Sequence, residues 1–238
     1  MVVLYLYRRG DLCHEHGARD GDVGLQPGSN LEGVPAQASN PWGPYSIWRI
    51  GETVDEELKA LYDADVWEHA QAFPHGTPEY RAMRERDRQR RARAAELDSN
   101  GRLQAAEDFF HAARLFQHGN TPEDAWKAHQ LAVQSANLGH RPARWMAAAA
   151  YDRWLMYQGK PQKYGTQYVS DGKRQRLWDV DPATTDEDRA EWDVPPLAEQ
   201  LRKAEEATRN HPPMPVGEDA PQWLKDALRR WEEEERRD

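Results

Sequence analysis

Apolar residues recur at helical spacing through the middle of the chain, and this pattern predicts four to five helices. The predicted helices cover residues 53–73, 77–97, 103–118, 121–139 and 141–159. Thr77 and Thr121 each precede a proline and an acidic residue, which is a helix start signal. Gly119, Gly139 and Gly159 end the last three of these helices, because glycine favours the backbone conformation that follows a helix.

Beyond residue 160 the helical spacing gives way to short β-prone runs, which predict a small β-hairpin. Its strands are expected within 165–169 and 175–180, with Asp171 and Gly172 in the turn. Helical spacing then returns, and a proline-rich linker follows it before a final charged helix. The two helices after the hairpin are expected at 185–192 and 195–209, the linker at 210–220 and the final helix at 221–236.

The start of the chain shows neither the helical nor the strand spacing of apolar residues. Residues 11–45 are rich in Gly, Pro, Asn, Asp and Ser, so we expect residues 1–49 to be disordered or loosely ordered. An alternative is that the true start of the chain lies further downstream. A hydrophobic content of 38% and a charged content of 31% agree with regions outside a core. The 10 tryptophans nevertheless require a packed core somewhere in the chain.

Together these patterns predict a mainly α fold. We expect a helical bundle or helical-hairpin domain at residues 50–209, with a small β-hairpin insert near 165–180. The region 1–49 precedes this domain, and residues 210–238 form the linker and the charged C-terminal helix.

Charge and cysteine content limit the partners. The net charge is −9 and the isoelectric point about 5.5, so nucleic acid and membrane are not expected partners. No apolar run approaches the roughly 20 residues of a membrane helix, and residues 1–9 do not have the order of a signal peptide. The single Cys13 excludes an internal disulfide and a cysteine-cluster metal site. We expect a cytoplasmic bacterial protein that binds a small polar ligand or another protein; its oligomeric state is left open.

Polar clusters interrupt the apolar helical sequence between residues 107 and 168 and mark the candidate site. A polar side chain in an apolar setting needs a partner, so such groups converge on each other or on a ligand. The clusters are Asp108/His111, Gln117-His118-Gly119, Asp152-Arg153 and the loop from Pro161 to Gln167.

Asp152 and Arg153 lie in a helix that is apolar on nearly all sides, so we expect both to be buried and paired. In a functional role, Asp152 is a general base or ligand anchor and Arg153 binds an anion. In a structural role, the two residues hold the loop that follows. The structural role is favoured for Arg153, and both roles stay open for Asp152.

The loop carries Gln162, Tyr164, Thr166 and Gln167 around Gly165. Its amides and hydroxyl are suited to binding a polar ligand without charge, and equally to fixing the loop to the helix that contains Asp152. Gly165 permits a positive φ or a close backbone approach.

His111 and His118 are seven residues apart and share one helical face. With a carboxylate such as Asp108 or Asp152 they resemble a Zn²⁺ ligand set. However, Arg114 lies between them and repels a dication, and no HExxH motif is present, so we predict neither a metal nor a cofactor. An acid–base role for His118 is favoured over a metal, because imidazole titrates near neutral pH.

The first two predicted helices also carry charges on their inward faces. Asp65 and His69 are one turn apart and are expected to form a local hydrogen bond. Asp87 and Arg91 interrupt the apolar line of the second helix. The arginines of this helix point in every direction, so a solvated helix is favoured over a phosphate-binding edge.

The stretch from Thr121 to Ala150 resembles a helical-hairpin repeat of the Sel1/tetratricopeptide kind. Small residues at helical spacing, including Ala128, Ala132 and Ala136, let two helices approach closely. One such unit is present without a second copy at a fixed period, which disfavours a repeat array.

Residues 77–205 also resemble a bacterial family known only as a domain of unknown function. The family's QH, DRxL, QxYGTQ, acidic and PPL elements correspond to Gln117-His118, Asp152-Arg153-Trp154-Leu155, Gln162 to Gln167, Asp179-Val180-Asp181 and Pro195-Pro196-Leu197. The resemblance implies a shared fold and a shared site, but it implies no reaction.

Two functions follow from these observations. In the first, His111, Gln117 and His118 meet Asp152, Arg153 and the 162–167 loop in a cleft that binds a small polar or anionic ligand. If this cleft is catalytic, its side chains are suited to hydrolysis or proton transfer, with His118 or Asp152 as the base. In the alternative, the chain is a helical-hairpin interaction module without catalysis, and its buried polar clusters are structural.

Overall fold

The computed structural model describes residues 53–210, 215–218 and 220–237. These residues belong to one structural unit of the chain, which is described here by itself. The region 1–49 that was predicted to be disordered lies outside the described residues.

The prediction of a mainly α fold with a small β-hairpin is confirmed. The helices are α1 (Glu56–His69), α2 (Pro78–Ser99), α3 (Ala106–Gln117), α4 (Pro122–Asn137), α5 (Pro142–Tyr157), α6 (Asp186–Ala190), α7 (Leu197–Asn210) and α8 (Gln222–Glu235). The start signals act as predicted, because the hydroxyls of Thr77 and Thr121 accept hydrogen bonds from the first turns of α2 and α4. Gly139 and Gly159 have positive φ directly after α4 and α5.

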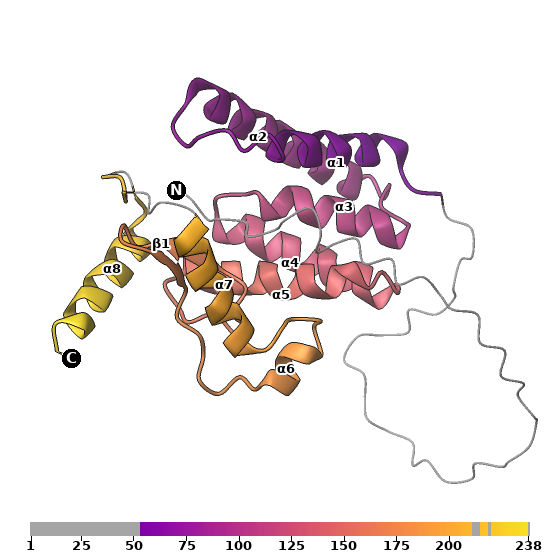
Figure 1. Cartoon of the computed structure of the whole chain (residues 1–238). Coiled ribbons are helices and arrows are strands. Elements are labelled where there is room, and N and C mark those ends of the chain that lie inside the picture. The colour runs from indigo at the N-terminus through magenta and orange to yellow at the C-terminus, as the bar shows by residue number, and fades with distance from the viewer. Residues whose placement is uncertain (1–52, 211–214, 219, 238) are drawn as a thin grey trace, which may run out of the picture. The chain divides into compact units, whose positions relative to one another are not determined.

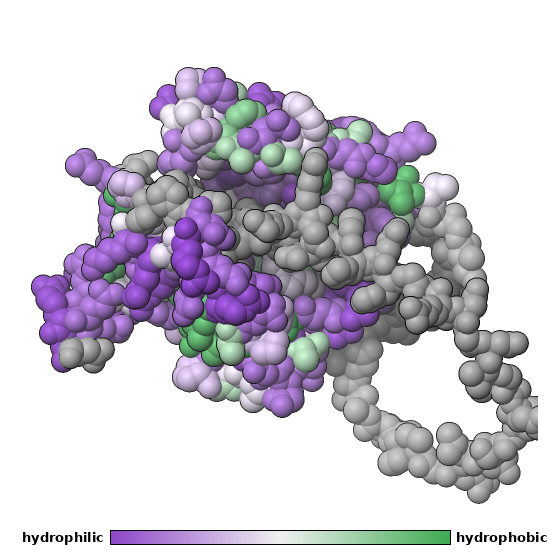
Figure 2. Space-filling view, in the orientation of Figure 1, coloured by the Kyte–Doolittle hydropathy of each residue, from purple (hydrophilic) through white to green (hydrophobic). Residues whose placement is uncertain are grey.

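The helices α3, α4 and α5 follow one another side by side, and α1 and α2 lie over α3 (Figure 1). A core of alanine, leucine and phenylalanine side chains fills the space between them. Its alanines, among them Ala112, Ala128 and Ala147, are fully buried and allow the close helix contacts that small residues predict. Figure 2 shows that one face of the molecule is largely hydrophilic over the described residues.

The β-hairpin consists of β1 (Tyr168–Ser170) and β2 (Gln175–Leu177), which pair antiparallel with Tyr168 opposite Leu177. It is shorter than predicted. The rest of the predicted second strand makes a single parallel bridge with the loop, between Val180 and Gln162. The hairpin therefore connects the 162–167 loop to the elements that follow it.

A second core lies between α5, the hairpin and the C-terminal helix α8. Met156, Trp178 and Val169 pack there against Leu224 and Trp231 of α8. The C-terminal helix is thus an integral part of this unit. Among the described helices, none is both long and apolar enough to span a membrane.

Candidate functional site

The hydrogen bonds divide the predicted site residues between two groups. Asp152, Arg153, Gln162, Thr166 and Gln167 form one group around the 162–167 loop. His118 instead contacts residues of α1, to which the sequence did not connect it. The structure thus confirms the contact between Asp152 and the loop, and it gives His118 a different partner from Asp152.

Asp152 is fully buried and uses both carboxylate oxygens within the protein. Its Oδ1 accepts hydrogen bonds from the backbone N–H groups of Lys163 at 2.8 Å and Tyr164 at 2.9 Å. Its Oδ2 accepts from the backbone N–H of Thr166 at 3.0 Å and from the Thr166 hydroxyl at 2.7 Å. Burial raises the pKa of Asp152 to about 6, while these four hydrogen bonds favour the ionised form. This carboxylate holds the loop as a structural anchor.

The side-chain amides of the two glutamines in the loop also form hydrogen bonds within the protein. The Gln162 amide accepts from the backbone N–H of Gln167 and donates to the carbonyls of Gln167 and Trp178. The Gln167 amide donates to the carbonyl of Ala149 and accepts from Nε of Arg153 at 3.0 Å. Gly165 has a φ of 88° at the centre of this loop, which explains why glycine occupies the position.

The backbone carbonyls at the end of α3 lie between the two groups. Arg153 donates to the carbonyl of Gln117, and Arg84 donates to the carbonyl of His118 at 2.7 Å. Guanidinium groups at a helix C-terminus are favoured by the negative end of the helix dipole. Arg153 therefore binds protein carbonyls, in line with its expected structural role.

The remaining predicted residues are buried among aromatic and apolar neighbours. The ring of His111 packs against that of Tyr62 with centroids 4.2 Å apart and a tilt of 32°, and Nδ1 of His111 has no hydrogen-bond partner among the described residues. Burial lowers the pKa of His111. The Gln117 side chain is also buried. Tyr164 lies beside Trp192, and burial raises the pKa of Tyr164 to about 12.

His118 belongs to a compact cluster with Asp65 and His69 of α1 and Asp87 of α2. Nδ1 of His118 lies 2.7 Å from Oδ1 of Asp65, and Nε2 of His69 lies 3.2 Å from Oδ1 of Asp87. The two imidazoles stack with centroids 3.8 Å apart. One ligand atom from each of the four side chains lies within 4.8 Å of the others.

The electrostatics of the cluster keep its carboxylates ionised and its buried imidazole neutral. Burial lowers the pKa of His118 to about 4, against the attraction of Asp65. Burial by itself raises the pKa of Asp65, but its interaction and hydrogen bond with His118, together with the charge of Arg114, outweigh burial, and the pKa of Asp65 is lowered. The pKa of Asp87 is lowered in the same way, chiefly through its hydrogen bond with His69.

Arginines contact the same carboxylates. Arg114 donates to Oδ2 of Asp65 at 3.1 Å, and Arg84 donates to Oδ2 of Asp87 at 2.8 Å. Arg90 donates to Oδ1 of Asp87. The Oδ2 atom of each carboxylate, here called the outer oxygen, is therefore held by a guanidinium. The Oδ1 atom of each, the inner oxygen, faces an imidazole, and that of Asp87 is also bonded to Arg90.

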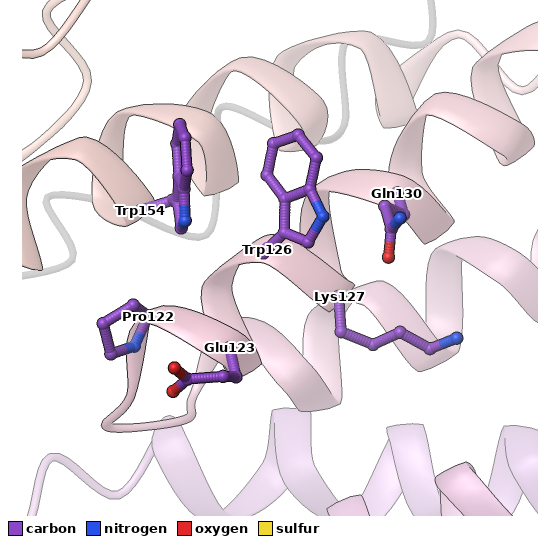
Figure 3. Close-up of a pocket in the computed structure, with 6 residues that line it drawn as sticks. All are labelled: Pro122, Glu123, Trp126, Lys127, Gln130 and Trp154. Atoms are coloured by element: carbon purple, nitrogen blue, oxygen red, sulfur yellow. The ribbon is translucent and has the colours of Figure 1, made fainter.

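A separate feature, at the surface of the protein, lies on the α4–α5 hairpin. Trp126 and Trp154 have ring centroids 4.8 Å apart and line a groove with a volume of about 240 Å³. Both indoles lie on the same side of the hairpin, near Glu123 and Pro122 (Figure 3). Trp126 is 37% exposed although it is a large aromatic residue.

The sequence singled out Asp87 as an interruption of an apolar line and predicted a local hydrogen bond between Asp65 and His69. That prediction is wrong, because Nε2 of His69 lies 3.6 Å from Asp65 and bonds to Asp87 instead. The sequence connected none of these residues with His118. The signal was present, because each charge on an inward helix face needs a buried partner. The groove of Trp126 and Trp154 was not predicted. In the sequence both residues fit the apolar pattern of their helices, and only the structure shows which of them is exposed.

Comparisons with known proteins gave no match: none of the protein families, curated proteins or solved structures that were searched is similar to this chain. The resemblance to the bacterial family and to Sel1-like hairpins therefore stays a prediction.

Proposed function

We propose that this protein is a helical interaction module whose α4–α5 groove binds a segment of a partner protein that presents a lysine or arginine side chain. One observation carries the proposal: the exposed Trp126 and the half-buried Trp154 form an aromatic surface beside Glu123, whose carboxylate makes no hydrogen bond or ion pair with the described residues.

The aromatic surface continues along the hairpin. Trp126 contacts His129, and Trp154 contacts Tyr151, with ring centroids 5.1 Å and 5.5 Å apart. Aromatic side chains contribute large contact areas at little cost in conformational entropy, and they dominate protein interfaces. The extent of this surface supports a protein segment as the occupant.

Charge favours a basic segment. The ammonium of Lys127 is bound by Asp98 at 2.6 Å, so it does not neutralise Glu123. Lys160 already places its ammonium 5.7 Å from the ring centroid of Trp154, which shows that this indole accommodates a cation. A cationic side chain on the two indoles therefore gains both a cation–π contact and the carboxylate of Glu123.

The buried polar groups support the same proposal. The carboxylate of Asp152 and the side-chain amides of Gln162 and Gln167 bond to the protein itself. This is the arrangement expected when polar clusters stabilise a fold.

The test is selection from a phage-displayed library of random peptides on the whole chain. We expect the selected peptides to be rich in lysine and arginine. Their affinity should fall at least about tenfold in Trp126→Ala, equivalent to about 1.4 kcal/mol, and it should also fall in Glu123→Gln. The matched control is Trp67→Ala, because Trp67 is 66% exposed on α1, and this variant should bind as wild type does. Selection of acidic peptides, or equal binding to Trp126→Ala, would reject the proposal.

A second candidate function is the binding of a small polar or anionic ligand with His118 as a base in hydrolysis or proton transfer. The contact between Nδ1 of His118 and Asp65 favours it, because such a carboxylate orients an imidazole for proton transfer. A thermal-shift screen against metabolites tests this candidate. A compound that stabilises wild type but not His118→Ala supports it, and flat responses reject it.

A further inference from the structure

We propose that Asp65, His69, Asp87 and His118 bind a divalent transition-metal ion of the Zn²⁺ type. This site lies between α1, α2 and the end of α3 and shares no residue with the aromatic groove, so either proposal can fail alone. It also differs from the His111/His118 pair that the sequence suggested and that was set aside.

The spacing of the ligand atoms fits such an ion. Oδ1 of Asp65 lies 2.7 Å from Nδ1 of His118 and 3.6 Å from Nε2 of His69, which in turn lies 3.2 Å from Oδ1 of Asp87. Zinc bonds of 2.0–2.1 Å in a tetrahedron place ligand atoms roughly 3.3 Å apart. Three of the six distances among the four ligand atoms are therefore near the required separation, and all six are within 4.8 Å.

The carboxylates are oriented by neighbours that a metal site needs. Oδ2 of Asp65 accepts from Arg114 and Oδ2 of Asp87 accepts from Arg84, so each outer oxygen is fixed and each inner oxygen faces the centre. Hydrogen-bonded partners of this kind fix the direction of metal ligands, while the positive charges of Arg84 and Arg114 oppose the binding of a cation.

The buried carboxylates of the cluster already have cationic partners. Asp65, Glu68 and Asp87 are buried, and four guanidinium groups make ion pairs with them: the buried Arg90 and the more exposed Arg84, Arg86 and Arg114. A divalent ion must therefore compete with these guanidinium groups for the carboxylates, so removal of one of them should strengthen its binding.

Two adjustments accompany binding. Arg90 bonds Oδ1 of Asp87 in the structure and must leave this oxygen, and Glu68 remains as its partner with Oε2 at 2.8 Å. His69 must also turn its ring away from the stack with His118, so that its Nε2 points at the ion. His69 is only partly buried, which leaves room for this turn.

The ligand chemistry selects the metal class. Two imidazoles favour Zn²⁺, Co²⁺ or Ni²⁺ over Mg²⁺ and Ca²⁺, which prefer oxygen ligands. Four protein ligands around one ion are typical of a closed, structural zinc site. The ion would then hold α1 and α2 against the end of α3.

The test is titration of the untagged, chelator-treated whole chain with Zn²⁺ by calorimetry and with Co²⁺ by visible absorption. We expect one Zn²⁺ per chain, and visible bands of tetrahedral Co²⁺ that Zn²⁺ abolishes. Asp87→Asn and His69→Gln should each weaken binding at least about tenfold. The controls Asp63→Asn and His129→Gln lie outside the cluster and should bind as wild type does.

Arg90→Gln provides an independent check, because it removes the competing guanidinium and should tighten Zn²⁺ binding. A structural role of the cluster in salt bridges alone predicts no such gain. The proposal is overturned if Zn²⁺ binding is absent, or if it is the same in wild type, Asp87→Asn and His69→Gln.

Discussion

At the scale of single residues, several buried polar side chains bind a specific piece of backbone. Asp152 is the clearest case, because three N–H groups and one hydroxyl of the loop depend on its two oxygens. Removing it leaves those donors buried without an acceptor, and such donors are costly.

Asp152→Ala should therefore lower the free energy of unfolding by about 3 kcal/mol or more at neutral pH, as measured by urea denaturation. Asp152→Asn should cost less, since it keeps one acceptor oxygen. The matched control is Asp226→Ala on the exposed side of α8, which should stay within about 0.5 kcal/mol of wild type. An Asp152→Ala protein as stable as the control would show that the loop does not depend on this carboxylate.

At the scale of elements, α8 shows how a thin apolar edge becomes part of a core. Trp231 is buried against Trp178 in an edge-to-face contact with centroids 5.4 Å apart, and its Nε1 donates to Asp179 at 2.8 Å. The guanidinium of Arg176 lies over the same indole, 4.2 Å from its centroid. The helix is thus held by apolar, polar and cation–π contacts together.

Trp231→Ala should accordingly destabilise the protein by about 3–5 kcal/mol in urea denaturation, because it leaves a large cavity in the second core. Trp67→Ala serves as the control, since Trp67 is exposed and should cost little. A similar small effect of both variants would mean that α8 docks only weakly.

The elements themselves were predictable, because helix starts, glycine stops and the hairpin turn depend on neighbours in the sequence. Thr77, Thr121 and Gly159 act locally, and their helices agree with prediction within a few residues. The contact of Asp152 with the loop was also predictable, because it spans only 11 to 14 residues.

The partner of His118 was not predictable in this way, because Asp65 lies 53 residues earlier in the chain. Helical periodicity shows which face of a helix is buried, but not which residue of another helix meets it. Asp65, His69 and Asp87 were each recognisable as inward charges, and only the packing of α1 and α2 on α3 joins them to His118.

At the scale of the whole molecule, buried imidazoles make stability depend on pH. Burial lowers the pKa values of His111, His129 and His140, so these residues are neutral in the folded protein. In the unfolded chain each binds a proton below about pH 6.5. At these three histidines the unfolded state then holds more protons than the folded state, so their contribution to stability falls as the pH decreases.

His111 offers the sharpest test of this dependence, because its buried Nδ1 has no hydrogen-bond partner among the described residues and a proton there creates an uncompensated charge. Through the buried histidines, the free energy of unfolding should fall as the pH drops below about 6.5, with each histidine contributing up to about 1.4 kcal/mol per pH unit. Asp152 acts in the opposite direction, because burial raises its pKa to about 6 and the folded protein therefore binds that proton more tightly than the unfolded chain. His111→Leu should reduce that slope, as measured by urea denaturation with a chelator present between about pH 7.5 and 5, a range that brackets the histidine pKa. Phe110→Leu, a buried neighbour without a titrating group, should lower stability equally at every pH. If both variants keep the wild-type slope, the protons that destabilise the fold bind elsewhere than at His111.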